Sequence, residues 1–179
     1  MRGLSYGVAM SLDGFIAGSH GENDWIVSDP EIDFAAIWAQ FDTLLMGRRT
    51  YEIARVRAAN WPDLGHRWIV VSQTLKPEDH PKITILGTGI AEAVAALRAG
   101  SGKDIWLFGG GVLFRELLDA GLVDRVEVMV MPVLLGSGVP LLTEGQRQTL
   151  SLVKSKALSS GILMLAYSVA GTPVLALET

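Results

Sequence analysis

The chain has 179 residues, of which 49% are hydrophobic and 19% are charged, and its formal net charge is -4. This composition is typical of a globular protein with a substantial core, and we expect one domain over residues 1–179. The acidic balance disfavours a nucleic-acid partner, because binding many phosphates requires clustered lysines and arginines. Cysteine does not occur in the sequence, which excludes disulfides and thiolate zinc sites, and we expect no bound metal.

The sequence shows no targeting or membrane segment. Met1 to Tyr6 leads directly into a strand-like pattern and lacks the charged and apolar regions of a signal peptide. No apolar run approaches the roughly 18 residues of a membrane span. We therefore expect a cytoplasmic protein with no membrane partner.

Strand and helix patterns alternate along the first half of the chain. Leu4–Met10 predicts an apolar strand, and the turn Ser11–Gly14 leads into a second short extended piece. Ser28 or Asp29 can cap a helix that has Pro30 in its first turn. Four apolar residues at helical spacing predict the buried face of this helix: Phe34, Ile37, Trp38 and Phe41.

The next two strands each end in a turn suited to an anion. Thr43–Met46 predicts a buried strand, followed by a helix that opens with Gly47-Arg48-Arg49-Thr50. Arg67–Val71 predicts a strand that ends in Ser72-Gln73-Thr74. Arginine forks match phosphate oxygens, and short hydroxyl side chains can cap a segment or hold a ribose or phosphate. Solvated charges and capping are the alternatives for these residues.

A strand, a glycine turn and a helix follow one another in the second half. Ile105–Phe108 predicts a buried strand, and Gly109-Gly110-Gly111 lets a ligand approach the backbone. The helix after it ends at Gly121, and its N–H groups and dipole favour an anion. A tight turn with no ligand is the alternative. The apolar face of this helix consists of Leu113, Phe114, Leu117 and Leu118. The other predicted elements are the strand Ile83–Leu86, the helix Ile90–Leu97, the strand Val126–Met131 and the strands Leu150–Leu158 and Ile162–Val169.

This order of elements predicts an α/β fold with a mostly parallel, helix-flanked sheet and a C-terminal antiparallel hairpin. Ligands of such sheets bind outside the carboxyl ends of the strands. The turns at 47–50, 72–74 and 109–111 all follow predicted strands, so they predict an extended ligand with several phosphates, such as a dinucleotide. The pattern is not the Rossmann fingerprint, since the glycine motif lies late in the chain and lacks the Gly-x-Gly-x-x-Gly spacing.

Several motifs resemble those of a known superfamily. Met46–Glu52 together with Phe108–Phe114 resembles the dihydrofolate reductase fold. Ser11–Gly14, Trp25-Ile26 and Pro132–Gly138 are more similar to one branch, the reductase domain of the bifunctional riboflavin-pathway deaminase-reductase and its stand-alone relatives. The resemblance spans nearly the whole chain. It implies a three-layer sandwich, NADPH as the cofactor, a small-molecule substrate and a homodimer.

The resemblance also implies which residues bind the cofactor. Its phosphates would be held by Gly47, Arg48, Arg49 and Thr50, and its pyrophosphate would be covered by Gly109, Gly110, Gly111 and Val112. Its adenosine ribose and any 2′-phosphate would lie near Ser72, Gln73 and Thr74, and arginine is common in the family where Gln73 stands. Its nicotinamide would be approached by Phe108 and Phe114 and lined by Ala9, Met10, Ile16 and Gly18.

Hydride transfer to a C=N or C=O bond needs a proton, which a partly buried carboxyl with a raised pKa can supply. The resemblance favours Asp13 for this role, because Asp13 matches the riboflavin-pathway pattern. Asp33 and Glu31 lie near the position of the helix-borne carboxylate of dihydrofolate reductases, and Asp33 is second to Asp13. As alternatives, aspartate before glycine is often a turn residue, and first-turn acids are often dipole partners. The substrate would contact Trp25, Glu31 and Phe34.

We therefore expect an NAD(P)H-dependent reductase that passes hydride to a small heterocyclic substrate, resembling the 5-amino-6-(5-phosphoribosylamino)uracil reductase of riboflavin biosynthesis. Dihydrofolate-reductase-type pteridine reduction and a non-catalytic nucleotide-binding module are the alternatives. The zinc site of the companion deaminase needs cysteines, and this chain has none. The stretch from His20 to Gln40 contains no lysine or arginine that could bind a substrate phosphate, and Arg55 and Arg57 are the alternative cations from elsewhere in the chain.

Overall fold

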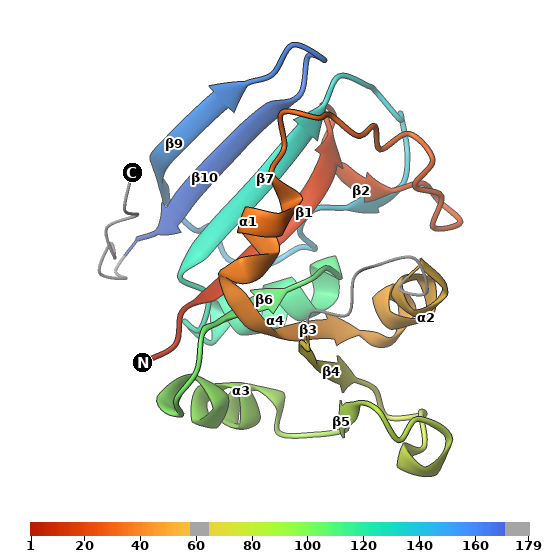
Figure 1. Cartoon of the computed structure of the whole chain (residues 1–179), viewed down its shortest axis with the longest axis vertical. Helices are drawn as coiled ribbons and strands as arrows, with labels where there is room; N and C mark the ends of the chain where they lie inside the picture. The colour runs from red at the N-terminus through yellow and green to blue at the C-terminus, as the bar shows by residue number, and fades with distance from the viewer. Residues whose placement is uncertain (58–64, 171–179) are drawn as a thin grey trace.

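A computed structural model describes residues 1–57 and 65–170 of the chain. The structure has one sheet of eight strands, in the order β5-β4-β3-β6-β1-β7-β10-β9, and a small sheet of β2 and β8. Figure 1 shows how these strands and the helices are arranged. The strands are β1 (Leu4–Ser11), β2 (Phe15–Ala17), β3 (Phe41–Gly47), β4 (Arg67–Val71), β5 (Thr84–Leu86), β6 (Asp104–Leu107), β7 (Arg125–Met131), β8 (Val139–Pro140), β9 (Leu150–Ala157) and β10 (Leu163–Val169). The helices are α1 (Phe34–Ala39), α2 (Arg48–Arg57), the 3-10 turn η2 (Pro77–Asp79), α3 (Ile90–Ala99) and α4 (Gly111–Asp119).

The large sheet is parallel from β5 through β7, and its last two strands, β10 and β9, run antiparallel to their neighbours. The predicted α/β class with a C-terminal antiparallel hairpin is therefore confirmed. Strand β1 occupies the centre, between β6 and β7, so the start of the chain pairs with segments from its second half.

The two faces of β1 carry different side chains. Leu4 and Tyr6 are fully buried in the larger core. On the other face, Gly7 lies against Trp106, whose indole Nε1 donates to the Gly7 carbonyl oxygen at 3.1 Å. A Cβ added at Gly7 would collide with that ring. Glycine at this position therefore allows Trp106 to pack directly on β1.

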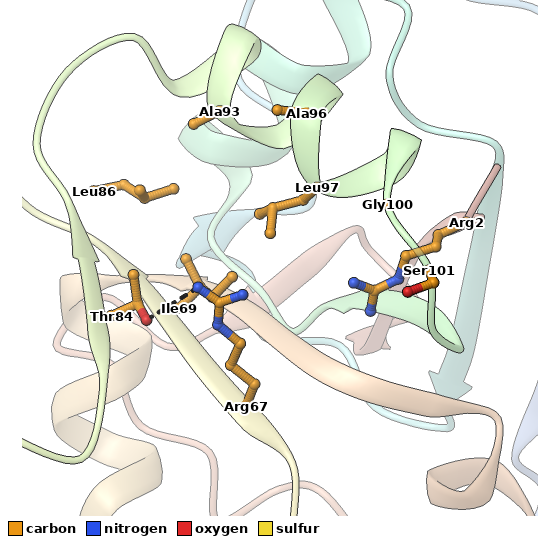
Figure 2. A pocket seen from close by; sticks show the side chains of 10 residues that line it. All are labelled: Arg2, Arg67, Ile69, Thr84, Leu86, Ala93, Ala96, Leu97, Gly100 and Ser101. Carbon is orange, nitrogen blue, oxygen red and sulfur yellow. Dashed lines mark hydrogen bonds between the residues drawn. The ribbon is translucent and has the colours of Figure 1, made fainter.

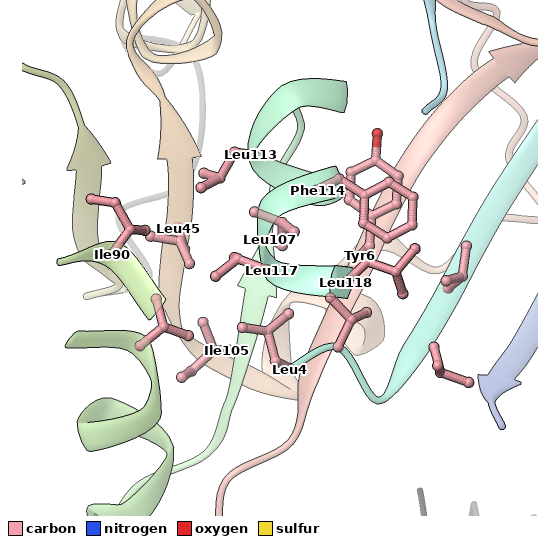
Figure 3. Packing of buried hydrophobic residues seen from close by; sticks show 14 of the residues in the cluster. Leu4, Tyr6, Leu45, Ile90, Ile105, Leu107, Leu113, Phe114, Leu117 and Leu118 are labelled. Atoms are coloured by element: carbon pink, nitrogen blue, oxygen red, sulfur yellow. The ribbon is translucent and has the colours of Figure 1, made fainter. Parts of the chain in front are cut away.

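Helices cover both faces of the sheet. On one face, α3 and α4 pack over the larger core, where Tyr6 and Phe114 stack with ring centroids 3.8 Å apart (Figure 3). On the other face, Tyr51 and Ala54 of α2 belong to a second buried cluster that includes the sheet residue Trp106. Burying side chains of this size contributes about 1.5–3 kcal/mol each. The arrangement confirms the predicted three-layer sandwich.

Helix α1 begins later than the sequence predicts and is shorter. Its N-cap is Asp33, whose carboxylate accepts a hydrogen bond from the backbone N–H of Ala36 at 2.9 Å. The predicted cap Asp29 instead accepts from the N–H of Glu31 at 2.7 Å, in the segment before the helix. Phe41 was expected on the helical face, but it is buried as the first residue of β3. Capping by Asp33 and the pairing of Phe41 with Asp104 of β6 thus override the predicted helical spacing.

The C-terminal hairpin forms one side of the sheet and is less covered than the rest. All eight residues of β9 are exposed. The turn between β9 and β10 is held by Glu31, whose carboxylate accepts from both the N–H and the hydroxyl of Ser159, at 3.0 and 2.7 Å. In the part of the chain that the structure describes, no helix is long and apolar enough to cross a membrane.

Candidate functional site

The sheet register brings the three predicted turns to one edge, which we call the carboxyl edge. Strand β3 is paired with β4 up to Gly47 and Val71, and with β6 up to Leu45 and Leu107. The N–H of Phe108 donates to the carbonyl oxygen of Leu45 at 2.8 Å, so β6 is still held to β3 where the glycine turn begins. The turns at 47–50, 72–74 and 109–111 therefore follow three strands that lie side by side.

The glycine turn is built so that a ligand can approach its backbone. Gly109 and Gly110 have φ of 126° and 99°, a region that residues with a Cβ rarely adopt. A Cβ on Gly109 would lie 3.4 Å from the Thr50 methyl group, so α2 closes one side of the turn. Gly110 is the N-cap of α4, and no side chain caps this nine-residue helix. Its first N–H groups and its dipole are thus available to an anion.

The arginine turn reaches the neighbouring strand end. The guanidinium of Arg48 donates to the Thr74 hydroxyl at 2.6 Å and to the Glu52 carboxylate at 2.7 Å. Arg48, Arg49 and Gln73 are exposed. Ser72 is buried, and its hydroxyl accepts from the N–H groups of Thr74 and Leu75 at 3.2 and 3.1 Å. The structure therefore gives Ser72 a capping role, while Arg48 and Thr74 face solvent together.

Two loops from distant parts of the chain lie beside the glycine turn. The N–H of Leu141 donates to the carbonyl oxygen of Gly14 at 2.9 Å, which joins the loop after β1 to the loop after β7. A Cβ on Gly111 would lie 2.8 Å from the carbonyl oxygen of Pro140. The small sheet of β2 and β8, in which Ile16 lies, is thereby fixed against the start of α4, where Val112 is 71% exposed.

The other residues that were predicted to line the nicotinamide differ in their burial and contacts. Gly18 donates its N–H to the carbonyl oxygen of Glu22 at 2.9 Å, so it closes a local turn. Ala9 is buried beside Met131. Met10 is half-buried and packs against the larger core.

The two predicted nicotinamide aromatics are on opposite faces of the sheet. Phe108 joins an aromatic group with Trp106 and Trp38, at centroid distances of 4.9 and 5.7 Å. Phe114 is only 3% exposed and stacks on Tyr6 in the larger core. The prediction that Phe114 approaches the nicotinamide is therefore wrong, because the helical turn points its ring into the sheet. The aromatic cluster around Phe108 was not predicted.

Asp13 does not have the raised pKa that we expected for a proton donor. Its carboxylate accepts from the Ser11 hydroxyl at 2.6 Å and from the N–H groups of Gly136 and Leu135 at 2.7 and 3.1 Å. These bonds, that of Ser11 first, lower the pKa of Asp13 to about 2. The carboxylate is therefore ionised at neutral pH and ties the loop after β1 to the loop after β7.

The other predicted acids are also engaged. Asp33 is exposed and caps α1. Glu31 binds Ser159 and lies 3.5 Å from the Lys156 ammonium, and these contacts, with Ser159 first, lower its pKa. Of the predicted substrate contacts, Trp25 is half-buried and donates to the carbonyl oxygen of Glu22 at 3.1 Å, whereas Phe34 is 41% exposed. The structure brings Trp25 to the apolar cluster with Ile37, and leaves Phe34 facing solvent.

One carboxyl with a raised pKa was missed by the sequence reasoning. Burial raises the pKa of Glu127, and Arg125 nearby opposes that shift. Glu127 lies in β7, paired with Gly7 of β1 on one side and with Ala166 of β10 on the other. The next pair on the same face of β1 and β7 is Ala9 with Met129. The available signal was a single acid on a strand face that also carries Arg125, Met129 and Met131.

This chain matches known proteins along most of its length. The family described as the RibD C-terminal domain matches residues 3–164. YyaP of Bacillus subtilis (strain 168) is 35% identical over 178 residues, which cover 93% of this chain and 94% of YyaP. A crystal structure of a Shewanella sp. PV-4 protein provisionally assigned to riboflavin biosynthesis has a TM-score of 0.79 and 27% identity, covering 94% of this chain and 99% of that one. Dihydrofolate reductase from Enterococcus faecalis in complex with NADP(H) has a TM-score of 0.66 and 18% identity, covering 94% and 96%.

The fold and the turns at its carboxyl edge define a dihydrofolate-reductase-like domain. Within that class, the chain belongs to the RibD C-terminal domain family. The resemblance seen in the sequence is thus confirmed, and family membership supports an oxidoreductase of the riboflavin-pathway reductase type.

Proposed function

We propose that this protein is an NAD(P)H-dependent reductase that binds its cofactor along the carboxyl edge and reduces a small heterocyclic substrate. The observation that carries the proposal is the convergence of Arg48, Thr74 and the glycine turn, which come from three strand ends. An extended ligand with phosphates at intervals matches a series of such turns better than a single free anion does.

The residues present fit a dinucleotide. The Gly109–Gly110 backbone has room that a Cβ would fill, and the uncapped start of α4 offers N–H groups to a pyrophosphate. Arg48 and Arg49 supply charge at the start of α2, and the Arg48–Thr74 pair suits the 2′-phosphate of NADPH. NADPH is therefore the cofactor we propose in preference to NADH.

Each group at the edge has a role in this proposal. When bound, the nicotinamide supplies the hydride that reduces the substrate. Arg48 and Arg49 hold phosphate oxygens, and the N–H groups of α4 hold the pyrophosphate. The aromatic rings around Phe108 exclude water on the α1 face of the sheet. Asp13 stays ionised and acts as a positioning residue, because it fixes the loop that carries Gly136.

The substrate we propose is a heterocycle of the pyrimidine or pteridine type. A ribosyl phosphate would need a cation near α1, and the stretch from His20 to Gln40 has none. Lys156 is the cation beside this stretch, but it pairs with Glu31. An acceptor without a phosphate therefore fits the described residues better than 5-amino-6-(5-phosphoribosylamino)uracil, which remains the family-based alternative. A nucleotide-binding module without turnover is the other alternative.

The test is to titrate NADPH and NADH separately while following thermal unfolding. A ligand that binds only the folded state stabilises it by about 2.7 kcal/mol at a hundred times its Kd. We expect NADPH to stabilise more than NADH, and Arg48→Gln to weaken NADPH binding by about tenfold or more. Arg55→Gln, an exposed position on α2, is the matched control and should change neither affinity.

Turnover separates an enzyme from a binding module. If NADPH binds, its oxidation is followed with pyrimidine and pteridine acceptors, and binding without oxidation of NADPH by either would favour the module. If neither nucleotide raises the unfolding temperature at millimolar concentration, the cofactor assignment is wrong. The homodimer stays a prediction, and light scattering of the purified protein would check it.

A further inference from the structure

A cavity lies on the far side of the sheet from the aromatic cluster, between α3 and the strands β4 and β5. Its volume is about 400 Å³, within the range of small-molecule sites. Figure 2 shows that its wall comprises Ile69 and Leu86 of the strands and Ala93, Ala96 and Leu97 of the helix. The cavity therefore has an apolar body, made by side chains from three elements.

The sequence of α3 explains why this space is not filled. Ile90 and Val94 are buried and hold the helix to the sheet. On the side of α3 that lines the cavity with β4 and β5, Ala93 and Ala96 contribute only methyl groups. As a result Ala96 is exposed although it lines the cavity, and Leu97 is half-buried. Larger side chains at the two alanines would close the space.

Two arginines stand at the mouth of the cavity, and they differ in how they are engaged (Figure 2). Arg2 is 8% exposed, forms an ion pair with Asp42 and donates to the Thr43 hydroxyl at 2.8 Å. Arg67 is exposed and has one long contact of 3.4 Å with the Thr84 hydroxyl. Within residues 1–57 and 65–170, no carboxylate lies in ion-pair distance of Arg67. Arg67 thus presents a charge that no carboxylate of the described residues pairs with, beside an apolar wall.

This cavity is separate from the candidate cofactor site. Arg67 and Thr84 are the first residues of β4 and β5, and Arg2 precedes β1. They stand at the amino ends of parallel strands, whereas the glycine and arginine turns stand at the carboxyl ends. A ligand in the cavity would therefore leave the carboxyl edge free.

We propose that this cavity is an accessory site for a small molecule with an apolar body and a single carboxylate. The apolar body fills the space beside Ala93 and Ala96, and the carboxylate pairs with the guanidinium of Arg67. A planar carboxylate matches the arginine fork through two parallel hydrogen bonds. A single free arginine neutralises one negative charge, which selects a monoanion over a phosphate ester. The occupant is thereby distinct in chemistry from a dinucleotide.

The probe is 4-phenylbutyrate, compared with its neutral analogue 4-phenylbutanamide, by titration of the ¹⁵N-labelled protein with and without NADPH. We expect the backbone amide resonances of α3 and β5 to show saturable chemical-shift changes. Half-saturation should occur at the same probe concentration with and without NADPH. The neutral amide should bind at least about fivefold more weakly, since it lacks the charge that Arg67 recognises. The Arg67→Gln variant should lose affinity for 4-phenylbutyrate by a similar factor, and Arg55→Gln should not.

A filling variant tests the apolar half of the proposal. Ala96→Leu places a larger side chain in the cavity and should weaken 4-phenylbutyrate more than tenfold, while thermal unfolding reports that it is folded. The exposed Arg67→Gln change tests the charge even if Ala96→Leu does not fold. Shifts that map outside α3 and β5, no shifts at millimolar probe, or equal binding of the acid and the amide would each overturn the site. None of these readouts depends on whether the protein is a reductase.

Discussion

The carboxyl edge and the acidic segment, by which we mean Asp13 together with residues 29–33, differ in how their polar groups are engaged. The carboxyl edge was predicted to bind the cofactor, and Asp13, Glu31 and Asp33 were predicted to act on the substrate, whereas Asp29 was predicted to cap a helix. At the carboxyl edge, Arg49 and the start of α4 have no side-chain partner in the described residues. In the acidic segment, Asp13, Asp29 and Glu31 each accept hydrogen bonds from loops more than a hundred residues away or from their own turn. Hydrogen-bond donors without a protein partner can bind an anion. Carboxylates that already accept several hydrogen bonds instead hold loops in place.

The electrostatics support the same distinction. The hydrogen bonds that hold the acidic segment also lower the pKa values of Asp13, Asp29 and Glu31. A carboxyl that releases its proton so readily is a poor proton donor at neutral pH. The pKa of Glu127, which is half-buried in β7, is instead raised. Four changes, in order of decreasing expected effect, test this division of roles.

Gly109→Ala should have the largest effect. The positive φ of Gly109 would impose a strain of about 1–3 kcal/mol on alanine, and its methyl would crowd Thr50 at the place where the pyrophosphate binds. We expect NADPH affinity to fall by about tenfold or more in calorimetric titration. Gly121→Ala is the control, because Gly121 also has a positive φ, of 67°, at the other end of α4, with nothing within 4 Å of an added Cβ. It should lower stability but not affinity. Equal losses of affinity would mean that the turn has no special role.

Asp13→Asn should lower stability without abolishing NADPH binding. The folded-state pKa of about 2 lies below the unfolded value of about 3.9, so the unfolded state binds more protons between these values. The contribution of Asp13 is therefore complete above about pH 4 and is lost as the pH falls toward 2. Urea unfolding at pH 6 and pH 3 should show a smaller loss in Asp13→Asn than in the natural sequence. Asp33→Asn is the control, because asparagine caps a helix as well as aspartate does.

Glu127→Gln should have the opposite pH dependence. Because burial raises the folded-state pKa of Glu127, the folded state binds more protons as the pH rises past the unfolded value of about 4.3. Stability is then lost as the pH rises through the folded pKa. We expect the glutamine variant to be more stable than the natural sequence at pH 8, with the difference vanishing at pH 4. A variant that is less stable at pH 8 would contradict the raised pKa of Glu127.

Glu31→Gln should have the smallest effect. Glutamine retains a carbonyl oxygen for Ser159 but loses the attraction to Lys156, and both side chains are exposed. We expect faster hydrogen exchange of the Ser159 amide with little change in the unfolding temperature. If this variant is folded but no longer oxidises NADPH, the result would instead support the prediction that Glu31 contacts the substrate.

The sequence predicted the carboxyl edge better than the acidic segment because the two depend on contacts of different range. A strand, glycines and a helix in direct succession, as in residues 105–121, form a local unit whose geometry follows from neighbours in the chain. The pKa of Asp13 is lowered first by the nearby Ser11 hydroxyl and then by the N–H groups of Gly136 and Leu135. The latter two are 123 and 122 positions away, and no local pattern indicates them. The start of α1 was misplaced for the same reason, since Ser28, Asp29 and Asp33 are all suitable caps and Asp29 has other partners.

The direction of side chains and the presence of a cavity also could not be predicted from the sequence. The pattern of α4 predicted an apolar face that includes Phe114, but it could not say that this face points away from the glycine turn's ligand side. The alanines of α3 were visible as helix formers, yet the cavity beside them depends on how far β4 and β5 lie from the helix.

The central position of β1 has a consequence for the order in which this protein can form. Gly3 binds Asp104 across 101 positions, and Glu31 binds Ser159 across 128. During synthesis on the ribosome, the first strand must wait for β6 and β7 before it can pair, and the acidic segment must wait for the final hairpin. Contacts of such long sequence separation slow folding. The loops beside the carboxyl edge can therefore be joined only after residues 135–141 have been translated.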